Sequence, residues 1–526
     1  MIIVYALGCL VFNFERLLQA RADPREPPLI PHRGIPFIGH IIGMFWHGAK
    51  YFQLLCSEKT NYPIYTLQTL TARTVIVKSP TLAGIVQRSS RSLSFYSMIL
   101  EVTKRIIAFD EPTMRIVRDN ANRENGDYGL MPETHDLLSN VLGPGAILNS
   151  MSSIQLESFA NMLNNQGFLG DGVCTSLMGF VKNIFTTSNA LAIYGPENPF
   201  AMHPSLINDF WNYESGMIAL LADIFPAITA RKPYLARERI LKGLQEFVER
   251  EHYKKASLLI QQRVSINLKH GLTTKMAGNA ELIMLFGILG NAVPTTFWLL
   301  ANIFSRPALL TELRQEAEKA VTRKDGQKEA VIHVNVLKTS CPVLVSTYRE
   351  TLRAIANLAS VRFVLEDTLI ADKYLLKKNS IVQIASGVIH VDESVWGPDA
   401  ASFNPRRFIS TSSTNSEQFS TGTAAVAVGE QTATQLPKNV PSAAYRAFGG
   451  GSVICPGRHF AQSEIVGFAA LVLLAFDVTA EDGGVIQLPE RDDRRIPLSV
   501  MKPMKDVRVR IRKRETFEKV RWGLEL

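Results

Sequence analysis

The sequence has few cysteines, and no two of them lie close together. Cys9, Cys56, Cys174, Cys341 and Cys455 are scattered along the 526 residues, so neither a C-x-x-C metal pair nor the disulfide framework of a small secreted domain fits. A sparse, odd set of cysteines is typical of a reducing compartment, in which most thiols are buried. A chemical role for any one of these thiols must therefore be inferred from the residues around it.

Several patterns that would define a function are also missing. The formal net charge is +9, but the basic residues are scattered and do not alternate with aromatics, which excludes a typical nucleic-acid surface and favours an acidic protein or an anionic membrane as partner. No G-x-G-x-x-G follows a predicted strand, so we expect no fused nicotinamide or flavin domain. With 46% hydrophobic residues, a chain of this length can bury a large core.

An apolar segment is present at the N-terminus. Residues 1–14 are apolar apart from Gly8 and Asn13, and the first arginines follow this run. A secretory signal carries its positive charge before the apolar run. The pattern therefore favours a membrane anchor over residues 1–20, with the body of the chain on the cytosolic side. The run is short for a hydrocarbon core of about 30 Å, and the alternative is a helix that lies in the membrane interface.

The remainder divides by composition. Residues 21–36 are rich in proline, which predicts a stiff extended hinge. Strands are indicated at Ile64–Leu67 and Thr74–Val77, a mainly helical pattern runs from about Pro80 to Arg323, and mixed strand and helix follow. Residues 282–304 are almost wholly apolar but include Pro294 and several polar residues, which predicts a buried core helix and not a membrane span. Residues 410–441, rich in Ser, Thr, Ala and Gly, are predicted to form a surface insertion.

The most informative segment runs from Phe448 to Arg458. Three consecutive glycines, Gly449 to Gly451, allow the backbone to approach a flat ligand closely. Cys455 follows them and precedes a helix that we expect to start near His459. Backbone N–H groups and the helix N-terminus both favour thiolate over thiol, which is the form that binds iron. On these residues alone, Cys455 is equally explained as a small buried side chain in a glycine turn.

This segment resembles the heme-binding signature of the cytochrome P450 family, F-x-x-G-x-[R/H]-x-C-x-G, which is filled here by Phe448, Gly451, Cys455 and Gly457. The resemblance implies that Cys455 is the axial iron ligand of heme b (iron protoporphyrin IX), and that the other three residues bind the cofactor. It also implies a fold that is mainly α with small β-sheets: a single large helical domain with a β-rich N-terminal lobe. Residues 37–526 would form this heme-binding catalytic domain.

Two further elements occur in the family's order. Glu350 and Arg353 match its E-x-x-R, and a spacing of three places them on one helix face. Residues 403–408 resemble the third element, in which Arg407 would complete a buried structural ion network. Arg362 stands where family members place a heme-propionate partner. The closest likeness within the family is to the branch of sterol 7α-hydroxylases and prostacyclin synthase and to their filamentous-fungal relatives, and residues 291–300 carry it.

Two positions depart from the family pattern. Val453 replaces the arginine or histidine expected before the cysteine, so Arg446 or Arg362 would have to bind the propionates. Asn291 and Ala292 replace the acid–alcohol pair that helps to deliver protons to bound dioxygen, and Ala292 cannot donate a hydrogen bond. Water held by Asn291 or Thr295, or a substrate hydroxyl, would then supply protons. Alternatively, Asn291 only satisfies the helix backbone near Pro294, which lacks an N–H.

The resemblance implies a monooxygenase that oxidises a lipophilic small molecule with O2, of a terpenoid, sterol or polyketide type from fungal secondary metabolism. A separate membrane-bound NADPH–cytochrome reductase would supply the electrons, and the enzyme would lie on the endoplasmic reticulum membrane with its catalytic domain in the cytosol. Much of the pocket wall would come from residues 80–226. Two alternatives remain at this stage: a heme-thiolate isomerase or dehydratase that needs no reductase, and a heme-binding protein without turnover.

Overall fold

The computed structural model describes residues 23–32, 38–48, 50–57, 62–69, 72–165, 167–168, 171–324, 328–357, 360–409, 435–493 and 500–526. The expected membrane anchor, residues 33–36 of the expected hinge and most of the expected surface insertion lie outside these ranges. The description below is of the remaining parts of the chain.

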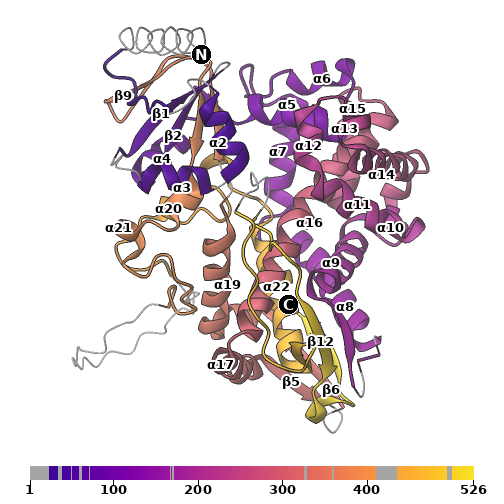
Figure 1. The fold of residues 1–526 in the computed structure, drawn as a ribbon. Coiled ribbons are helices and arrows are strands. Elements are labelled where there is room, and N and C mark those ends of the chain that lie inside the picture. The colour runs from indigo at the N-terminus through magenta and orange to yellow at the C-terminus, as the bar shows by residue number, and fades with distance from the viewer. Residues whose placement is uncertain are drawn as a thin grey trace, which may run out of the picture.

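Helices make up most of the structure, as the resemblance predicts (Figure 1). In most of them apolar positions recur at three- and four-residue spacing, so that one face packs against neighbouring helices, whereas α22 is buried almost all round. In the N-terminal half the helices are α2 Gly39–His47, α3 Lys50–Ser57, α4 Pro80–Arg88, α5 Tyr96–Ile107, α6 Glu111–Arg118, α7 Leu130–Val141, α8 Ala146–Asn165, α9 Leu177–Tyr194, α10 Pro199–Met202, α11 Leu206–Ser215, α12 Met217–Ala222, α13 Pro226–Thr229 and α14 Arg231–Glu249. They are followed by α15 Leu258–Lys269, α16 Thr274–Phe304, α17 Pro307–Ala317, α18 Val334–Ser340, α19 Pro342–Ile355, α20 Ser386–Ile389, α21 Glu393–Trp396 and α22 Arg458–Ala475.

The largest sheet has five strands in the order β1-β2-β10-β7-β3. The two strands predicted from the sequence are confirmed as β1 (Ile64–Gln68) and β2 (Arg73–Val77), which pair in antiparallel register. β10 (Ile381–Ile384) runs parallel to β2, and β7 (Ser360–Val364) then pairs with β10 and with the short β3 (Leu93–Ser94). The lobe that the sequence places at the N-terminus is therefore completed by a segment from the last third of the chain.

Three smaller sheets lie at other sites. β11 (Phe476–Ala480), β12 (Arg508–Lys513) and β4 (Val173–Ser176) form one, and β13 (Arg521–Glu525), β6 (Glu329–His333) and β5 (Val321–Lys324) form another. β8 (Thr368–Ile370) and β9 (Tyr374–Leu376) pair as a hairpin. In the described part of the proline-rich segment, the N–H of Glu26 donates to the Asp23 carbonyl at 2.9 Å in a turn, and Leu29 forms an isolated bridge to Thr66 of β1.

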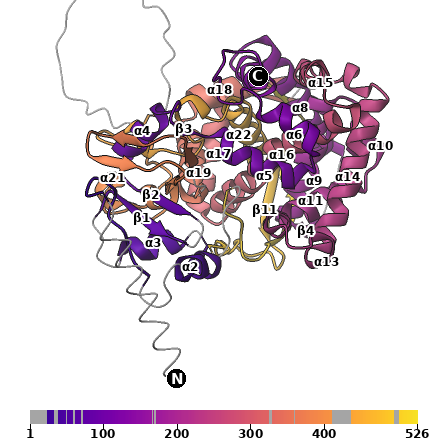
Figure 2. The same cartoon turned by 90° about the horizontal axis from the view of Figure 1, so that it is seen from above.

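The long helix α16 lies near the centre of the molecule in both ribbon views (Figures 1 and 2). It is the only described helix that is long and apolar enough to cross a membrane, but 72% of its most apolar window is buried inside the protein. Pro294 lies within it and leaves one backbone hydrogen bond unmade. The prediction of a buried core helix over residues 282–304 is confirmed. The helix begins earlier than predicted, at Thr274, where the Thr273 side chain accepts from the N–H of Met276.

Candidate functional site

Cys455 lies on a glycine-rich loop directly before α22. The backbone N–H of Cys455 donates to the carbonyl of Phe448 at 2.9 Å, which closes the loop on itself, and a short 3-10 turn spans Gly451–Val453 between them. α22 begins at Arg458, one residue from the position expected from sequence, with Gly457 at its N-cap. The thiol thus lies beside the N-terminus of an 18-residue helix, whose dipole favours negative charge.

Glycine is required in this loop for two separate reasons. Gly449 and Gly451 have φ values of +76° and +66°, which side-chain-bearing residues rarely adopt. A Cβ on Gly451 would also lie 2.9 Å from the Cβ of Gln87 and 3.0 Å from the Gln87 carbonyl oxygen. α4, which carries Gln87, therefore supports the loop at a distance that only glycine permits.

The Cys455 side chain is exposed, although protein surrounds it on most sides. This surrounding protein raises the pKa of the thiol above its usual value, while the N–H of Gly457, which hydrogen-bonds to the sulfur, and the nearby Arg458 act in the opposite direction. By contrast, the thiol of Cys341 is fully buried, and burial raises its pKa to about 12. Of the described cysteines, Cys455 is the one that combines exposure with a backbone donor and a helix N-terminus.

The structure brings Glu350, Arg353 and Arg407 together as a buried ion network. Both guanidiniums contact the Glu350 carboxylate: Arg353 Nε and Nη2 lie 2.7 and 2.8 Å from its oxygens, and Arg407 Nε lies 3.1 and 3.2 Å from them. The N–H of Asn404 donates to the same carboxylate at 2.9 Å. Burial works against the charge of Arg407, but Asp399 and Glu350 together raise its pKa. Every charge in this network therefore has an opposite charge beside it.

Arg362 and Arg446 form a second buried pair with a different environment. Each is 3% exposed, and neither contacts a carboxylate among the described residues. Arg446 Nε lies 3.3 Å from the Ser386 hydroxyl, while its two terminal nitrogens have no partner. Burial lowers the pKa of each guanidinium to about 10, and for Arg446 the neighbouring Arg362 adds to the effect.

Arg362 donates to the Val361 carbonyl at 2.8 Å, whereas both terminal nitrogens of Arg446 lack a partner. Two buried cations without a carboxylate are costly unless an anion binds to them. Guanidiniums are well suited to carboxylates, because two parallel N–H groups match the two carboxylate oxygens. The pair thus fits the two propionates of heme b, and the residues present are compatible with this cofactor. Val453 has no charged side chain, and these two arginines, which were predicted from the sequence to bind the propionates in its place, are the buried cations without a carboxylate.

One face of α16 is partly exposed inside the protein. Ile283, Gly287 and Asn291, which recur every four residues, are partly or fully exposed, although the rest of this helix is mostly buried. A Cβ on Gly287 would have no neighbour within 4 Å, so there is open space beside the helix at this point. The Thr295 hydroxyl is not presented to this space: Thr295 is 1% exposed and donates to the Asn291 carbonyl at 2.7 Å. Thr295 follows Asn291 on the same face, but of these two expected catalytic residues only Asn291 is partly exposed.

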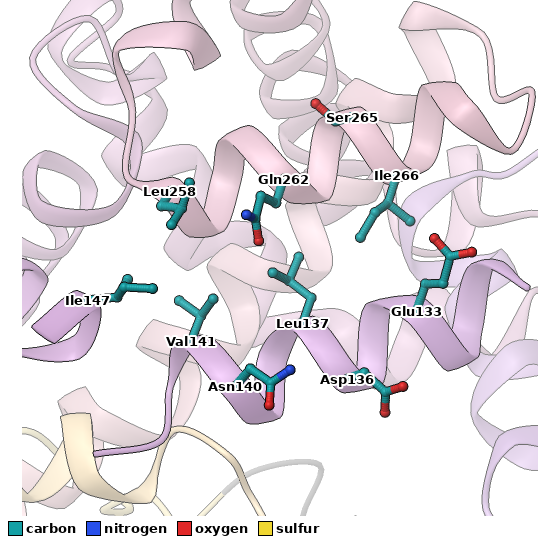
Figure 3. A pocket seen from close by; sticks show the side chains of 10 residues that line it. All are labelled: Glu133, Asp136, Leu137, Asn140, Val141, Ile147, Leu258, Gln262, Ser265 and Ile266. Atoms are coloured by element: carbon teal, nitrogen blue, oxygen red, sulfur yellow. The ribbon is translucent and has the colours of Figure 1, made fainter. Parts of the chain in front are cut away.

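Some supporting residues were not expected from the sequence. Gln87 and His135 both contact the Cys455 loop, the latter with a ring nitrogen 3.1 Å from the Ser452 carbonyl. Neither belongs to a recognisable motif, because each acts through contacts between distant segments. His135 lies on α7, next to a surface groove of about 460 Å³ between α7 and α15 (Figure 3). None of the ten residues that line this groove belongs to the expected site.

Comparison with known proteins identifies the class. The family model for cytochrome P450 matches residues 164–507. The chain is 28% identical to "Cytochrome P450 monooxygenase nodJ" of the fungus Hypoxylon pulicicidum, over 100% of this chain and 97% of that protein. It is 25% identical to "Cholesterol 7-alpha-monooxygenase" of Cricetulus griseus, over 64% of this chain and 65% of that protein. A solved structure of a cyanobacterial cytochrome P450 with bound retinoic acid matches 94% of this chain and 100% of that one, with a TM-score of 0.67 and 17% identity.

The chain belongs to the cytochrome P450 family. It is a monooxygenase that uses heme ligated by a cysteine thiolate, and its relatives are fungal enzymes and members of the sterol 7α-hydroxylase branch. The family, the mainly helical fold and the heme cofactor expected from the sequence motifs are confirmed.

Proposed function

We propose that Cys455 is the axial ligand of the heme iron and that Arg362 and Arg446 bind the heme propionates. The observation that carries this proposal is the combination of an exposed thiol at the N-terminus of α22 with two buried guanidiniums that lack a carboxylate. Phe448, Gly451 and Gly457 shape the loop that presents the sulfur. The Glu350–Arg353–Arg407 network lies behind this loop as a structural support.

When it is bound, heme supplies the activation of dioxygen and the transfer of an oxygen atom to the substrate. The protein contributes the thiolate, the orientation of the substrate and the exclusion of water. The apolar face of α16, with Ile283, Phe286 and Ile288, provides a wall suited to a lipophilic molecule. We therefore propose a terpenoid, sterol or polyketide substrate from fungal secondary metabolism; the cholesterol in the name of the cholesterol 7-alpha-monooxygenase relative is one such sterol.

Proton supply differs from the pattern expected for the family. Ala292 has no hydroxyl, and the Thr295 hydroxyl is already donated to a backbone carbonyl. We propose that Asn291 holds a water molecule or a substrate hydroxyl that carries the proton, because an amide itself does not ionise near neutral pH. The same two observations favour one other reaction, an isomerisation or dehydration that needs no reductase. Oxidation of NADPH coupled to dioxygen consumption separates the two.

Electrons are proposed to come from a separate NADPH–cytochrome reductase. The net charge of +9 favours docking to an acidic flavoprotein surface. Residues 37–526 are proposed as the catalytic domain, with residues 21–36 as the hinge that connects it to a membrane anchor.

Two exposed apolar groups support an association with the endoplasmic reticulum membrane. On α2, Phe45 and Trp46 are 73% and 70% exposed, and around the start of α13, Phe225 and Ile228 are 77% and 80% exposed. The two helices lie on the same side of the molecule, in the upper half of Figure 1 and at the lower edge of Figure 2. Aromatic and aliphatic side chains of this kind insert into a bilayer interface.

The carbon monoxide difference spectrum of the reduced full-length protein tests the heme site. We expect the Soret band at the position typical of thiolate ligation, and we expect Cys455→Ala to abolish it. Cys341→Ala is the matched control and should leave the band in place. A thiolate-type band that survives Cys455→Ala would contradict the proposal.

A further inference from the structure

Asn291 has a defined orientation on α16. Its side-chain oxygen Oδ1 lies 3.0 Å from the backbone nitrogen of Val500, which is 209 residues away in the sequence. A backbone N–H can only donate, so the atom of the carboxamide that faces it must be the oxygen. The amino group, Nδ2, is consequently on the other side.

Nδ2 of Asn291 has no acceptor among the described residues. Because Nδ2 has no acceptor and is not a buried atom, it faces accessible space. Asn291 itself is partly exposed, on the same face as Ile283 and Gly287.

The other polar side chains in this half of α16 are already satisfied. Thr295 donates to the Asn291 carbonyl, Thr296 to the Ala292 carbonyl at 2.9 Å, and Asn302 to the Trp298 carbonyl at 2.8 Å. In the described residues of this stretch, Asn291 is therefore the one polar side chain whose donor atom has no acceptor at all.

The carboxamide is also held in place. The segment that contains Val500 is tied to α16 a second time, because Trp298 Nε1 donates to the Met501 carbonyl at 2.7 Å. The N–H of Met501 donates to the Ile355 carbonyl at 2.9 Å, which connects the segment to α19. A donor fixed by three such contacts is preorganised and loses little entropy when it binds a partner.

We propose that Nδ2 of Asn291 donates a hydrogen bond to an oxygen atom of the substrate, which makes Asn291 a specificity-determining residue. The enzyme would thus select lipophilic molecules that already carry a carbonyl, ether or hydroxyl oxygen over the corresponding hydrocarbons. The reason is that a hydrocarbon would cover the amino group and leave its N–H unpaired. This inference rests on the proposed heme site and narrows its substrate class.

Azole probes test the inference without a known substrate, since an imidazole nitrogen binds heme iron and shifts the Soret band. The probes are the ortho, meta and para isomers of 1-(acetylphenyl)imidazole, each compared with its isopropenyl counterpart, which has the same planar shape but no acceptor oxygen. In the full-length heme protein, we expect at least one acetyl isomer to bind about fivefold more tightly than its counterpart, the effect of one net hydrogen bond. Equal binding within all three pairs would overturn the inference.

Three variants locate the effect. Asn291→Asp keeps an oxygen for the Val500 N–H but replaces the donor with an acceptor, so the preference for the acetyl probe should disappear. Asn291→Leu should also abolish it, whereas Thr296→Val, in which the lost hydroxyl is fully buried against the backbone, should retain it. If the preference for the acetyl probe persists in both Asn291→Asp and Asn291→Leu, the role of Asn291 is refuted and the proposed heme site is not affected. No Soret shift with any azole refutes the proposed heme site instead.

Discussion

The two buried arginine clusters differ in what surrounds them. In the Glu350 network, Arg353 and Arg407 share a carboxylate that is 0% exposed, and Asp399 adds a second one at 2.8 Å from Arg407. In the other cluster, Arg362 and Arg446 lie near each other with no carboxylate among the described residues. Both clusters are buried to a similar degree, so burial alone does not account for the difference.

This difference distinguishes a cluster that supports the fold from a cluster that can bind an anion. A buried charge that is paired within the protein is compatible with a stable folded state only while both partners are present. A buried charge without a partner destabilises the empty protein and becomes favourable only when an anion binds. The charges of the first cluster are therefore compensated by the chain alone, and those of the second are compensated only when an anionic ligand binds. The predictions below test this difference, beginning with the largest effect.

Removal of the shared carboxylate should have the largest effect. Glu350→Ala leaves the buried Arg353 guanidinium without a carboxylate and leaves Arg407 with Asp399 alone. We expect a loss of about 3–5 kcal/mol in the free energy of unfolding of the heme-free protein. The measurement is chemical denaturation followed by circular dichroism. Glu312→Ala is the control, because Glu312 pairs with Arg406 on the surface, and its loss should cost less than about 1 kcal/mol. Equal losses in the two variants would contradict the distinction between the networks.

A side chain on the loop should have the next largest effect. Gly451→Ala combines a φ of +66° with a contact of 2.9 Å to Gln87, and we expect a loss of about 2–3 kcal/mol together with reduced heme content. Gly483→Ala is a matched control, since Gly483 has a φ of +90° but nothing within 4 Å of the added Cβ. It should lose only about 1 kcal/mol. The difference between the stability losses of the two variants measures the cost of the contact with α4. Equal losses would show that this contact costs nothing.

Removal of an unpaired arginine should act in the opposite direction to the Glu350 variant. Arg446→Met removes a buried charge without a partner, and we expect the heme-free protein to become more stable by about 1 kcal/mol. Heme should bind about tenfold less tightly, because one propionate loses a charge-assisted contact. Denaturation of the heme-free protein and transfer of heme to apomyoglobin measure the two quantities. A heme-free protein that is less stable than the wild type would mean that Arg446 has a structural partner.

A buried acid outside both arginine clusters provides a test that depends on pH. The Glu464 carboxylate of α22 accepts hydrogen bonds from the amides of Gln155 and Asn189, and burial raises its pKa to about 8. Because the folded pKa is raised, the folded state holds a proton that the unfolded state has released. Stability should therefore fall as pH rises from about 4.5 to about 8, by at most about 1.4 kcal/mol per pH unit. Glu464→Gln should remove this slope, and an unchanged slope would assign it to other groups.

The sequence predicted much of the site because its motifs are local. Glu350 and Arg353 lie on one helix at a spacing of three, and Cys455 lies between its glycines and the start of α22. Their relation follows from backbone geometry and needs no knowledge of the fold. The strands β1 and β2 and the buried character of α16 were also predicted from local patterns, since the residue types within a short segment indicate a strand or a buried helix.

Other features could not be predicted in this way. The Thr295 hydroxyl donates to the Asn291 carbonyl, and the sequence does not reveal this side-chain orientation. The five-stranded sheet takes two strands from residues 360–384, and strand pairing at such separation leaves no local signal. Gln87 supports the Cys455 loop only because α4 packs against it.

The sequence by itself determined the family, the sulfur that is proposed to bind iron and the acid–arginine pair on α19, since each depends on residues within a few positions of one another. Only the tertiary structure decided that Arg362 and Arg446 form a pair without a carboxylate and that Val500 orients the Asn291 amide. These relations join segments tens to hundreds of residues apart, and such contacts exist only once the core has brought their elements together. The sequence therefore identified the reactive centre, and the packing around it decided which charges and donors remain available to ligands.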